Sequence, residues 1–457
     1  MPKPLNKVRA AKLALYRQQG KIHARAVAGR FNRLRWAMVW FTQLIFYGGC
    51  WLNWESQGVS RQAILFDIAH EKLYLFGLVL WPQDALLLAL ALIVAATALF
   101  LATALAGRLF CGFACPQTIY TMIFGWLEAR VEGDHLARVK LDRRPASPGK
   151  FARKLLKHAL WGLLAAWTAI TFVGYFTPIR DLLPSLPALR TGPWEAFWLI
   201  FYGLFTYVQA GLAREAVCQH MCPYSRFQGV MFDPATVNVA YDRQRGEPRR
   251  GGGDCIDCGI CVEVCPTGID IRDGLQYPCI NCGLCIDACD PVMARIGAPR
   301  GLIRFASEND LAGRRQSGGL AARPRLIVYG GLLLACLLLA GAYVAERPLL
   351  RVDVLRDRGA LWREMADGRI ENAYTLKLVN LDDAPRLFRV TVSGLPGLEI
   401  VGADRFTVAA ASLRPVAVTL AAPGGVLPAG LRPINFDIIA DHDPASRARE
   451  KSTFALP

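Results

Sequence analysis

The chain has 457 residues, of which 53% are hydrophobic, and it carries a net charge of +16. The hydrophobic share and the mean hydropathy of +0.26 are high for a soluble protein, and the length allows two to four structural units. Residues 346–457 hold 15 Lys and Arg against 14 Asp and Glu, so nearly all the excess positive charge lies among the apolar segments before them. This distribution is typical of a membrane protein and argues against a partner that is a nucleic acid.

Five stretches are long and apolar enough to cross a bilayer, which takes about 20 residues. They predict an α-helical membrane protein with spans near 36–54, 85–106, 159–177, 194–212 and 325–345. The first and fourth stretches are rich in Trp, Phe and Tyr and carry Gln43, Asn53 and Gln209. For these two, a buried core helix is the alternative interpretation.

Loop charges predict the orientation of these spans. Residues 1–35 form a basic tail with ten Lys and Arg and no acid, and residues 107–157 hold another ten against four acids. The positive-inside rule therefore places the N-terminus in the cytoplasm. Five crossings put residues 213–324 in the cytoplasm and residues 346–457 outside it. We expect the first span to remain as an anchor, because the basic tail is too long for a signal peptide and no small-residue cleavage site follows.

Two cysteine pairs follow the ends of predicted spans. "RLFCGFACPQT" contains Cys111 and Cys115, and "VCQHMCPYSRF" contains Cys218 and Cys222. Both read C-x3-C-P, and residues i and i+4 share one face of a helix. Pro116 and Pro223 disfavour helix at the preceding residue and suit the first turn of a new helix. We predict that each pair lies at a break between a span and an interfacial helix, and that the four thiols meet in one site.

Soft thiolates favour Cu(I) over Cu(II), so such a site is predicted to bind copper and promote its reduction. His220 and Met221 are candidate additional ligands, with ordinary packing as the alternative. Four inert cysteines, a third iron–sulfur cluster and a redox dithiol pair also remain open. For Arg108 and Arg214, at the ends of two spans, contact with lipid headgroups is the default and attraction to anionic cluster sites is the alternative.

The other cysteines and histidines have simple structural interpretations. Cys50 and Cys336 lie alone within spans and are expected to be small packing residues. His70 and His158 are isolated and are expected to be structural, and His135, in a charged loop, is expected to be solvated.

The densest motif is "CIDCGICVEVCPTGIDIRDGLQYPCINCGLC", followed by Cys289. Its two repeats, each C-x2-C-x2-C-x3-C, consist of Cys255, Cys258, Cys261 and Cys265 and of Cys279, Cys282, Cys285 and Cys289. This is the bacterial ferredoxin pattern for two [4Fe–4S] clusters, in which the fourth ligand of each cluster comes from the other repeat. It predicts one cluster on Cys255, Cys258, Cys261 and Cys289 and another on Cys265, Cys279, Cys282 and Cys285, in an inserted ferredoxin-like domain at about 250–295. Disulfides are disfavoured in the cytoplasm, and a zinc ribbon has two C-x2-C pairs with a longer spacer.

From residue 346 the pattern changes to short runs of alternating polar and apolar residues. "AYTLKLVNLDDAPRLFRVTVSGLPGLEIVG", "RFTVAAASLRPVAVTLAAP" and "INFDIIADHD" are separated by Gly, Pro and Asp turns. This pattern predicts an antiparallel β-sandwich at 346–457. The segment has no cysteine and no evident catalytic constellation, so a role in interaction is the default.

The arrangement as a whole resembles the CcoG/FixG/RdxA family of cytochrome c oxidase accessory proteins. The resemblance rests on the two C-x3-C-P motifs, the doubled ferredoxin motif, "APRGLIRF" after it, and the C-terminal sandwich, which matches the family's immunoglobulin-like domain. It implies reduction of Cu(II) to Cu(I) for assembly of cbb3-type cytochrome c oxidase. The eight ferredoxin cysteines would be cluster ligands, and Cys111, Cys115, Cys218 and Cys222 the family's membrane-edge motif.

Three hypotheses follow for the function. The first is a cupric reductase that receives electrons from a cytoplasmic donor and works with oxidase assembly factors or a copper transporter. The second is a quinol-linked membrane electron conduit of the NapH and NosR kind, which combines the same motifs. The third is an assembly scaffold in which the clusters are structural and the β-sandwich holds a partner.

Overall fold

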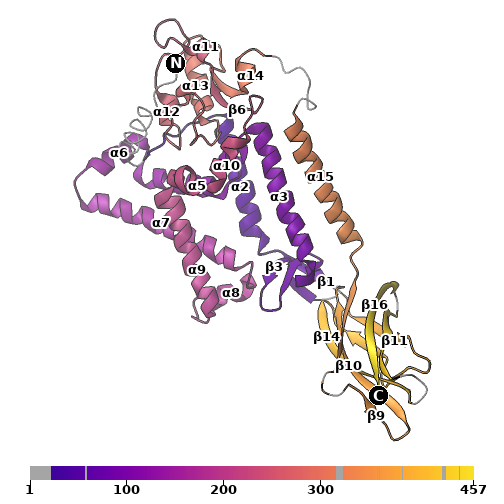
Figure 1. Cartoon of the computed structure of the whole chain (residues 1–457). Coiled ribbons are helices and arrows are strands. Elements are labelled where there is room, and N and C mark those ends of the chain that lie inside the picture. Colours follow the sequence, from indigo (N-terminus) through magenta and orange to yellow (C-terminus); the bar gives the residue numbers. More distant parts are fainter. Residues whose placement is uncertain are drawn as a thin grey trace. The chain divides into compact units, whose positions relative to one another are not determined.

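The computed structural model describes residues 22–56, 59–314, 323–357, 359, 361–382, 384–424, 429–441 and 443–457. The chain divides into two compact units. The first consists of residues up to Cys50 and of Leu88–Leu338, and the second of Trp51–Leu87 and Leu339–Pro457. Figure 1 shows the elements of both units, coloured along the chain from indigo at the N-terminus to yellow at the C-terminus.

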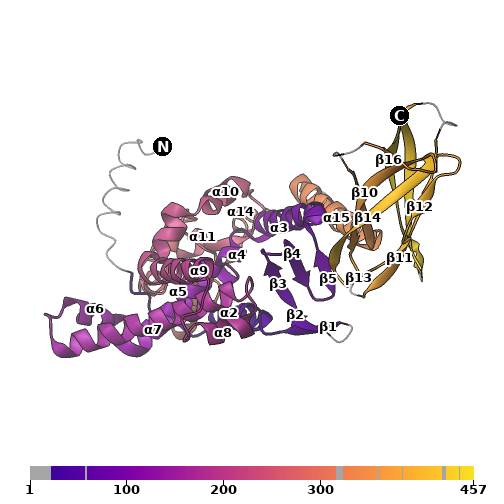
Figure 2. The same cartoon turned by 90° about the horizontal axis from the view of Figure 1, so that it is seen from below.

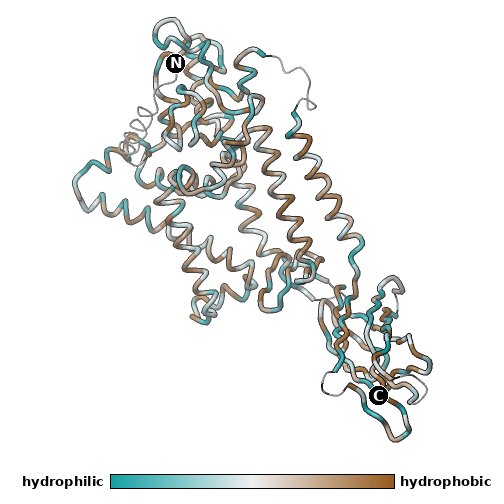
Figure 3. Tube along the Cα trace, in the orientation of Figure 1, coloured by the Kyte–Doolittle hydropathy of each residue, from teal (hydrophilic) through white to brown (hydrophobic). Residues whose placement is uncertain are grey.

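Long helices dominate the first unit. They are α2 (Arg30–Gly49), α3 (Ala85–Ala106), α5 (Pro116–Glu132), α7 (Pro148–Val173), α9 (Pro193–Thr206) with its π-helical continuation η2 (Tyr207–Ala213), and α15 (Pro324–Ala345). Within the described residues, four of these are long and apolar enough to cross a membrane: α3, α7, α9 with η2, and α15. Only 17% of the most apolar stretch of α3 and none of that of α15 is buried within the chain. Figure 3 shows both helices as predominantly hydrophobic along their length, which is what a lipid environment requires.

The predicted spans differ from these helices mainly at their ends. The first predicted span falls on α2, which is outside the group of four, and its predicted end was wrong because Asn53 and Trp54 lie in strand β1 (Asn53–Ser56). The third begins earlier than predicted, since Ser147 caps α7 by accepting a hydrogen bond from the backbone amide of Lys150. The charged first turns of α7 are helical although they are too polar to lie in a membrane.

Short elements connect the long helices and build the cysteine-rich part of the first unit. They are α4 (Leu109–Phe113), α6 (His135–Arg143), α8 (Ile179–Ser185), η3 (Val217–Met221), α10 (Pro223–Met231), α11 (Arg243–Gly246), α12 (Ile260–Glu263), η4 (Ile271–Asp273), α13 (Leu284–Arg295) and α14 (Glu308–Leu311). Strands β6 (Asn238–Tyr241) and β7 (Ile303–Ala306) flank the eight-cysteine motif in the sequence and pair antiparallel, which brings the two ends of the cysteine-rich segment between them together. Figure 1 shows α11, α12, α13 and β6 gathered in one region of the unit.

One carboxylate attaches the cysteine-rich segment to α2. Gly29, at the N-cap of α2, has no side chain to accept from the first amides of the helix. Asp287 of α13 supplies the acceptor, taking hydrogen bonds from the backbone amides of Phe31 at 3.2 Å and Asn32 at 2.7 Å. A buried carboxylate also interacts favourably with the positive end of the helix dipole. The cap thus fixes α13 against the start of α2.

The second unit contains the predicted β-sandwich. One sheet has the order β12 (Glu399–Val401), β14 (Ser412–Pro423), β10 (Arg369–Asn380) and β8 (Leu350–Arg356), with β9 (Arg363–Glu364) also paired to β10. The other has the order β13 (Arg405–Val408), β11 (Arg386–Ser393), β15 (Gly430–Ala440) and β16 (Asp443–Leu456). Long strands β10 and β14 run antiparallel through twelve paired positions, and Figure 2 shows them side by side. Buried Tyr374, Phe388, Phe436 and Phe454 fill the core between the sheets, so the sandwich prediction is confirmed.

Short strands that belong to this second unit lie between the first two predicted spans. Besides β1 they are β2 (Val59–Gln62), β3 (Ile64–Asp67), β4 (Lys72–Leu75) and β5 (Leu78–Leu80), followed by a 3-10 turn, η1 (Pro82–Asp84). Asp84 is buried and pairs with Arg347 and with Arg351, at 3.1 Å from the latter. Lys72 donates to the backbone carbonyl of Ala411 at 2.9 Å. These contacts join the strands to the sandwich.

Candidate functional site

The two ferredoxin repeats fold in the same way. In each, the residue two positions after the first cysteine has a left-handed backbone, φ 58° at Asp257 and 53° at Asn281. Two positions later a glycine does the same, φ 70° at Gly259 and 74° at Gly283, and α12 or α13 starts there. Glycine adopts this conformation without the strain that a Cβ causes, so the motif can turn tightly enough to direct successive cysteines into one space.

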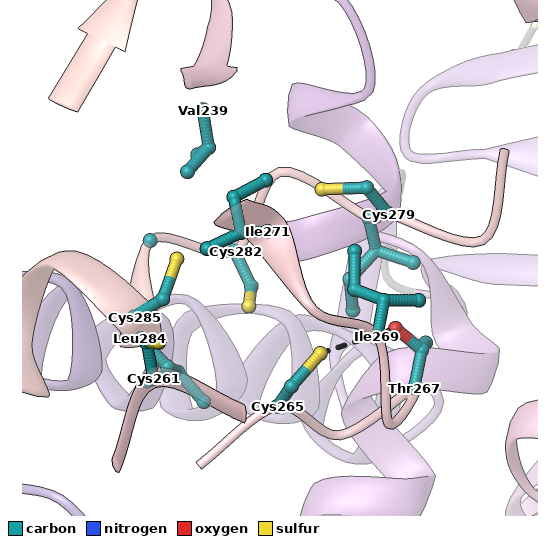
Figure 4. Close-up of a pocket in the computed structure, with 12 residues that line it drawn as sticks. Val239, Cys261, Cys265, Thr267, Ile269, Ile271, Cys279, Cys282, Leu284 and Cys285 are labelled. Atoms are coloured by element: carbon teal, nitrogen blue, oxygen red, sulfur yellow. Dashed lines mark hydrogen bonds between the residues drawn. The ribbon is translucent and has the colours of Figure 1, made fainter. Parts of the chain in front are cut away.

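The eight cysteines line two small cavities. One is lined by Cys261, Cys265, Cys279, Cys282 and Cys285 (Figure 4). The other is lined by Cys255, Cys258, Cys261 and Cys289. Apart from Cys261, which lines both cavities, each cavity is lined by the cysteines that the spacing assigns to one cluster. Below, the first cavity is called the inner cavity and the second the outer cavity, because Cys258 is exposed whereas Cys279 and Cys282 are buried.

The donor set fits an iron–sulfur cluster better than a single ion. Among the described residues, no three His, Cys, Asp or Glu side chains lie close enough to share one metal ion. Four thiols spread around one cavity instead suit a polynuclear core that is held between them. Such a core also explains why so many thiols lie in an apolar cluster with Val239, Ile271 and Ile286.

Burial dominates the electrostatics of these thiols. It raises the pKa of Cys279 to about 12, of Cys289 to about 12 and of Cys261 to about 11. Nearby arginines partly offset this effect, Arg108 at Cys279 and Arg272 at Cys261. Without iron, these three thiols are therefore protonated at neutral pH, and ligation releases their protons.

The membrane-edge pairs lie at helix breaks, as predicted. Cys115 and Cys222 have extended backbones and occupy the N-caps of α5 and α10, where Pro116 and Pro223 take the first helical position. Cys111 lies in the short helix α4, and Cys218 in the π-helical turn η3. The breaks are stabilised locally, since Thr118 donates to the carbonyl of Cys111 and Ser225 to that of Cys222.

The structure brings the two pairs into electrostatic contact. After burial, the thiols of Cys115 and Cys222 are the largest causes that raise the pKa of Cys218, to about 11. Burial and then Cys115 raise the pKa of Cys111 to about 12, and its thiol donates to Gln228 of α10 at 3.4 Å. The four thiols do not form a ready-made metal site, because no three of them, among the described residues, lie close enough to share one ion. A shared site thus remains a prediction that needs the thiols to draw together around an ion.

The first pair also touches the inner cavity. Gly112, next to Cys111, packs so tightly that an added Cβ would lie 2.6 Å from the carbonyl oxygen of Ile280 and 3.1 Å from the Cα of Cys282. Cys111 itself packs in the apolar cluster that contains Cys282, Ile280 and Leu284. The α4 turn is therefore in van der Waals contact with the loop that carries a ligand of the inner cavity.

Arg108 lies between the same two regions. It is 4% exposed, and its guanidinium donates to the backbone carbonyls of Tyr277, Cys279 and Ser225. The default expectation of contact with lipid headgroups was wrong for this residue, because the cysteine loop covers it. It was also wrong for Arg214, which is buried and pairs with Glu128 at 2.7 Å.

Sequence reasoning missed Arg35. This side chain is 3% exposed, and its Nε donates to the carbonyl of Gly112 at 3.1 Å. Because Gly112 lies against Ile280 and Cys282, this hydrogen bond places Arg35 beside the inner cavity. Little in the sequence distinguishes Arg35 from the other basic residues of the tail, and only its place directly before the apolar run that starts at Trp36 could have suggested burial.

The remaining candidates have ordinary environments. Cys50 packs in an apolar cluster, and His158 accepts or donates a hydrogen bond with Tyr207 at 2.7 Å. His135 is less solvated than expected, since its side chain is 12% exposed and pairs with Asp134. Met221 is 65% exposed, on the side of η3 away from the packed core.

Comparison with known families matches most of the chain. A model described as a 4Fe-4S dicluster domain matches residues 213–252 and 248–308, and a 4Fe-4S binding domain matches residues 88–133. A model described as the IG-like fold at the C-terminus of FixG matches residues 341–457. Both membrane-edge pairs thus fall inside matches to iron–sulfur domains.

Individual relatives extend over nearly the full length. The chain is 35% identical to the nitrogen fixation protein FixG of Rhizobium meliloti, over 97% of this chain and 94% of that one. It is 38% identical to protein RdxA of Cereibacter sphaeroides, over 91% and 92%. Similarity to the ferredoxin-type protein NapH of Escherichia coli is lower, 26% identity over 52% of this chain and 75% of that one.

Proposed function

The chain belongs to the FixG/RdxA family of iron–sulfur electron-transfer proteins, and from this premise we propose that it reduces Cu(II) to Cu(I). The proposed role of the product is assembly of a cbb3-type cytochrome c oxidase. One electron comes from a cytoplasmic donor for each copper ion, and the ion keeps that electron as it passes to oxidase assembly factors or a copper transporter. When bound, two [4Fe–4S] clusters supply one-electron carriers between donor and copper.

The contact between α4 and the loop at Ile280 is the observation that carries this proposal. It puts Cys111 in the same apolar cluster as Cys282, so a copper ion on the membrane-edge thiols would lie next to the inner cavity. Thiolates stabilise Cu(I) relative to Cu(II), which makes bound copper easier to reduce. In this scheme Cys111, Cys115, Cys218 and Cys222 hold the substrate ion, and Thr118 and Ser225 keep the helix breaks in place.

Orientation and span number belong to the same proposal. The basic tail favours a cytoplasmic N-terminus, which would put the cysteine-rich segment in the cytoplasm and the sandwich in the periplasm. Helix α2 would serve as a fifth crossing. Its large apolar side chains support this, because Trp40 and Leu44 are 71% and 75% exposed and would otherwise face water.

The test is copper reduction by purified, anaerobically reconstituted protein. The clusters are reduced, Cu(II) is added, and Cu(I) is followed with a chromogenic chelator. We expect wild type to reduce copper and a Cys115→Ser/Cys218→Ser variant with intact cluster absorbance to lose most of the activity. Cys336→Ser is the control, since this thiol lies in α15, away from both cysteine pairs in the sequence. Equal rates in all three proteins would show that copper takes electrons without these thiols.

A quinol-linked electron conduit is the second candidate, favoured by one cavity. Beside Cys218, an amphipathic pocket is lined by Trp36, Trp126, Gln117 and Thr121. Its rings and polar groups suit a quinol headgroup, and NapH is similar over half of the chain. Cluster reduction by a soluble quinol analogue, abolished by Trp126→Ala, would favour this candidate over a soluble donor.

Two further alternatives can be tested, one by iron content and the other by oxidase assembly in cells. More iron per chain than two [4Fe–4S] clusters hold, lost in the Cys115→Ser/Cys218→Ser variant, would assign the membrane-edge thiols to a third cluster. Full oxidase assembly in cells that carry a variant without clusters would favour a scaffold. In the scaffold case, the β-sandwich would be the part that binds the partner.

A further inference from the structure

Each of the two cavities has arginine beside it, but the arginines differ in how their charge is compensated. Beside the outer cavity, Arg272 forms ion pairs with Asp270 at 2.7 Å and with Asp257. Asp290 follows Cys289 directly and adds a further negative charge there. The surroundings of the outer cavity therefore hold at least as much negative as positive charge.

Beside the inner cavity, the two arginines have no such compensation. Arg35 and Arg108 are 3% and 4% exposed, and across the described residues neither has a carboxylate within ion-pair distance. Their hydrogen bonds go to backbone carbonyls, of Gly112 for Arg35 and of Tyr277, Cys279 and Ser225 for Arg108. Asp287, the nearby acid of α13, is taken up by the first amides of α2.

A buried cation without an anion is costly, because the loss of hydration is not offset by an opposite charge. Two such cations at one cavity indicate that a negative group belongs in it. A [4Fe–4S] core with four thiolates is such a group, and its negative charge grows by one on reduction. The arginines stabilise the reduced form more than the oxidised form, since the extra electron adds to the charge they face.

We propose that the positive charges of Arg35 and Arg108 raise the reduction potential of the cluster held by Cys265, Cys279, Cys282 and Cys285. The cluster of the outer cavity does not gain this stabilisation, because the charge of Arg272 is already neutralised by two carboxylates. The potentials of the two sites are thereby ordered, with the electron favoured at the inner cavity, next to the α4 turn. Burial of the inner cavity alone would have the opposite effect, because a low dielectric disfavours added charge.

The two arginines interact electrostatically with different cysteines of the inner cavity. Arg35 acts on Cys282 and Cys265, and Arg108 on Cys279. Each residue therefore provides an independent test of the same statement. The inference concerns the clusters alone and does not depend on copper, so it stands or falls separately from the proposed reduction of Cu(II).

The test is a redox titration of the full-length protein with both clusters, followed by electron paramagnetic resonance and without copper. We expect Arg35→Gln to lower one of the two midpoint potentials by at least about 59 mV, a tenfold change in the one-electron equilibrium constant. Arg35→Lys keeps the charge and should restore most of the shift. Arg108→Gln should lower the same midpoint, whereas Arg272→Gln should lower the other one, because it removes a positive charge beside the outer cavity and leaves Asp270 without its ion-pair partner.

Several outcomes would overturn the proposal. Equal potentials for Arg35→Gln and Arg35→Lys would show that the charge has no role, and a structural role alone predicts that equality. Shifts of different signals in Arg35→Gln and Arg108→Gln would show that the two residues do not act on one cluster. If Arg35→Gln fails to incorporate iron, Arg108→Gln with Arg108→Lys tests the same expectation, and no shift there rejects it.

Discussion

A single methyl group at Gly112 should separate the α4 turn from the inner cavity. The Cβ of an alanine would lie 2.6 Å from the carbonyl oxygen of Ile280 and 3.1 Å from that of Asn281. Both are backbone atoms, which cannot rotate away as a side chain can, so either α4 or the cysteine loop must shift. Such overpacking typically costs about 1–3 kcal/mol. Gly125, in the middle of α5, has nothing within 4 Å of the corresponding position and provides the comparison.

The two variants can be compared directly because both replace a helical glycine with alanine. Gly125→Ala should be neutral or stabilising by up to about 1 kcal/mol, the gain in helix propensity. Gly112→Ala should have a free energy of unfolding in detergent that is lower than that of Gly125→Ala by about 1–3 kcal/mol. It should also lose iron faster when a chelator is added. If both variants have the same unfolding midpoint and retain iron equally, the close approach of α4 to the cysteine loop is not part of the folded protein.

Three further predictions concern the cap, the second unit and the thiols. Asp287→Ala removes the acceptor for the first amides of α2 and should cost about 1 kcal/mol, the usual value of an N-cap, measured as an earlier unfolding midpoint that Asp287→Asn largely restores. Asp84→Ala leaves Arg347 buried without its partner and should destabilise the second unit by about 3–5 kcal/mol, seen as faster proteolysis, and wild-type resistance would contradict the pairing. Because burial raises the pKa of Cys111 to about 12 and of Cys218 to about 11, both are protonated at pH 7, so Cu(I) uptake should release protons and tighten as the pH rises. Copper uptake with no proton release, followed with an indicator dye in weak buffer, would exclude thiolate ligands.

The sequence predicts those parts of this fold that follow from local pattern. Apolar length identifies the helices α3 and α15, and alternation identifies the sandwich. The C-x3-C-P spacing places Pro116 and Pro223 at helix starts, because proline restricts the residue before it. In each case the information lies within a few consecutive residues.

What the sequence could not predict depends on contacts between distant segments. Arg35 and Gly112 are 77 positions apart, and neither stands out among the arginines and glycines of the chain. Arg108 was expected to contact lipid because nothing in the first 110 residues indicates that the loop at Tyr277 covers it. The short strands of residues 59–80 escaped notice because each is only three or four residues long and none alternates over a longer run.

Arg108 links the two cysteine sites, and this link has a testable consequence for copper. The same guanidinium opposes the rise in pKa that burial causes at Cys279 of the inner cavity and at Cys111 and Cys218 of the membrane edge. If two thiols lose their protons to bind one Cu(I), the local charge falls by one. That added negative charge should lower the reduction potential of the inner cluster, and by reciprocity a reduced inner cluster should bind Cu(I) more weakly and favour its release. A titration of the clusters with and without Cu(I) measures this coupling, and a potential that rises or stays constant on copper loading would contradict binding through two thiolates beside Arg108.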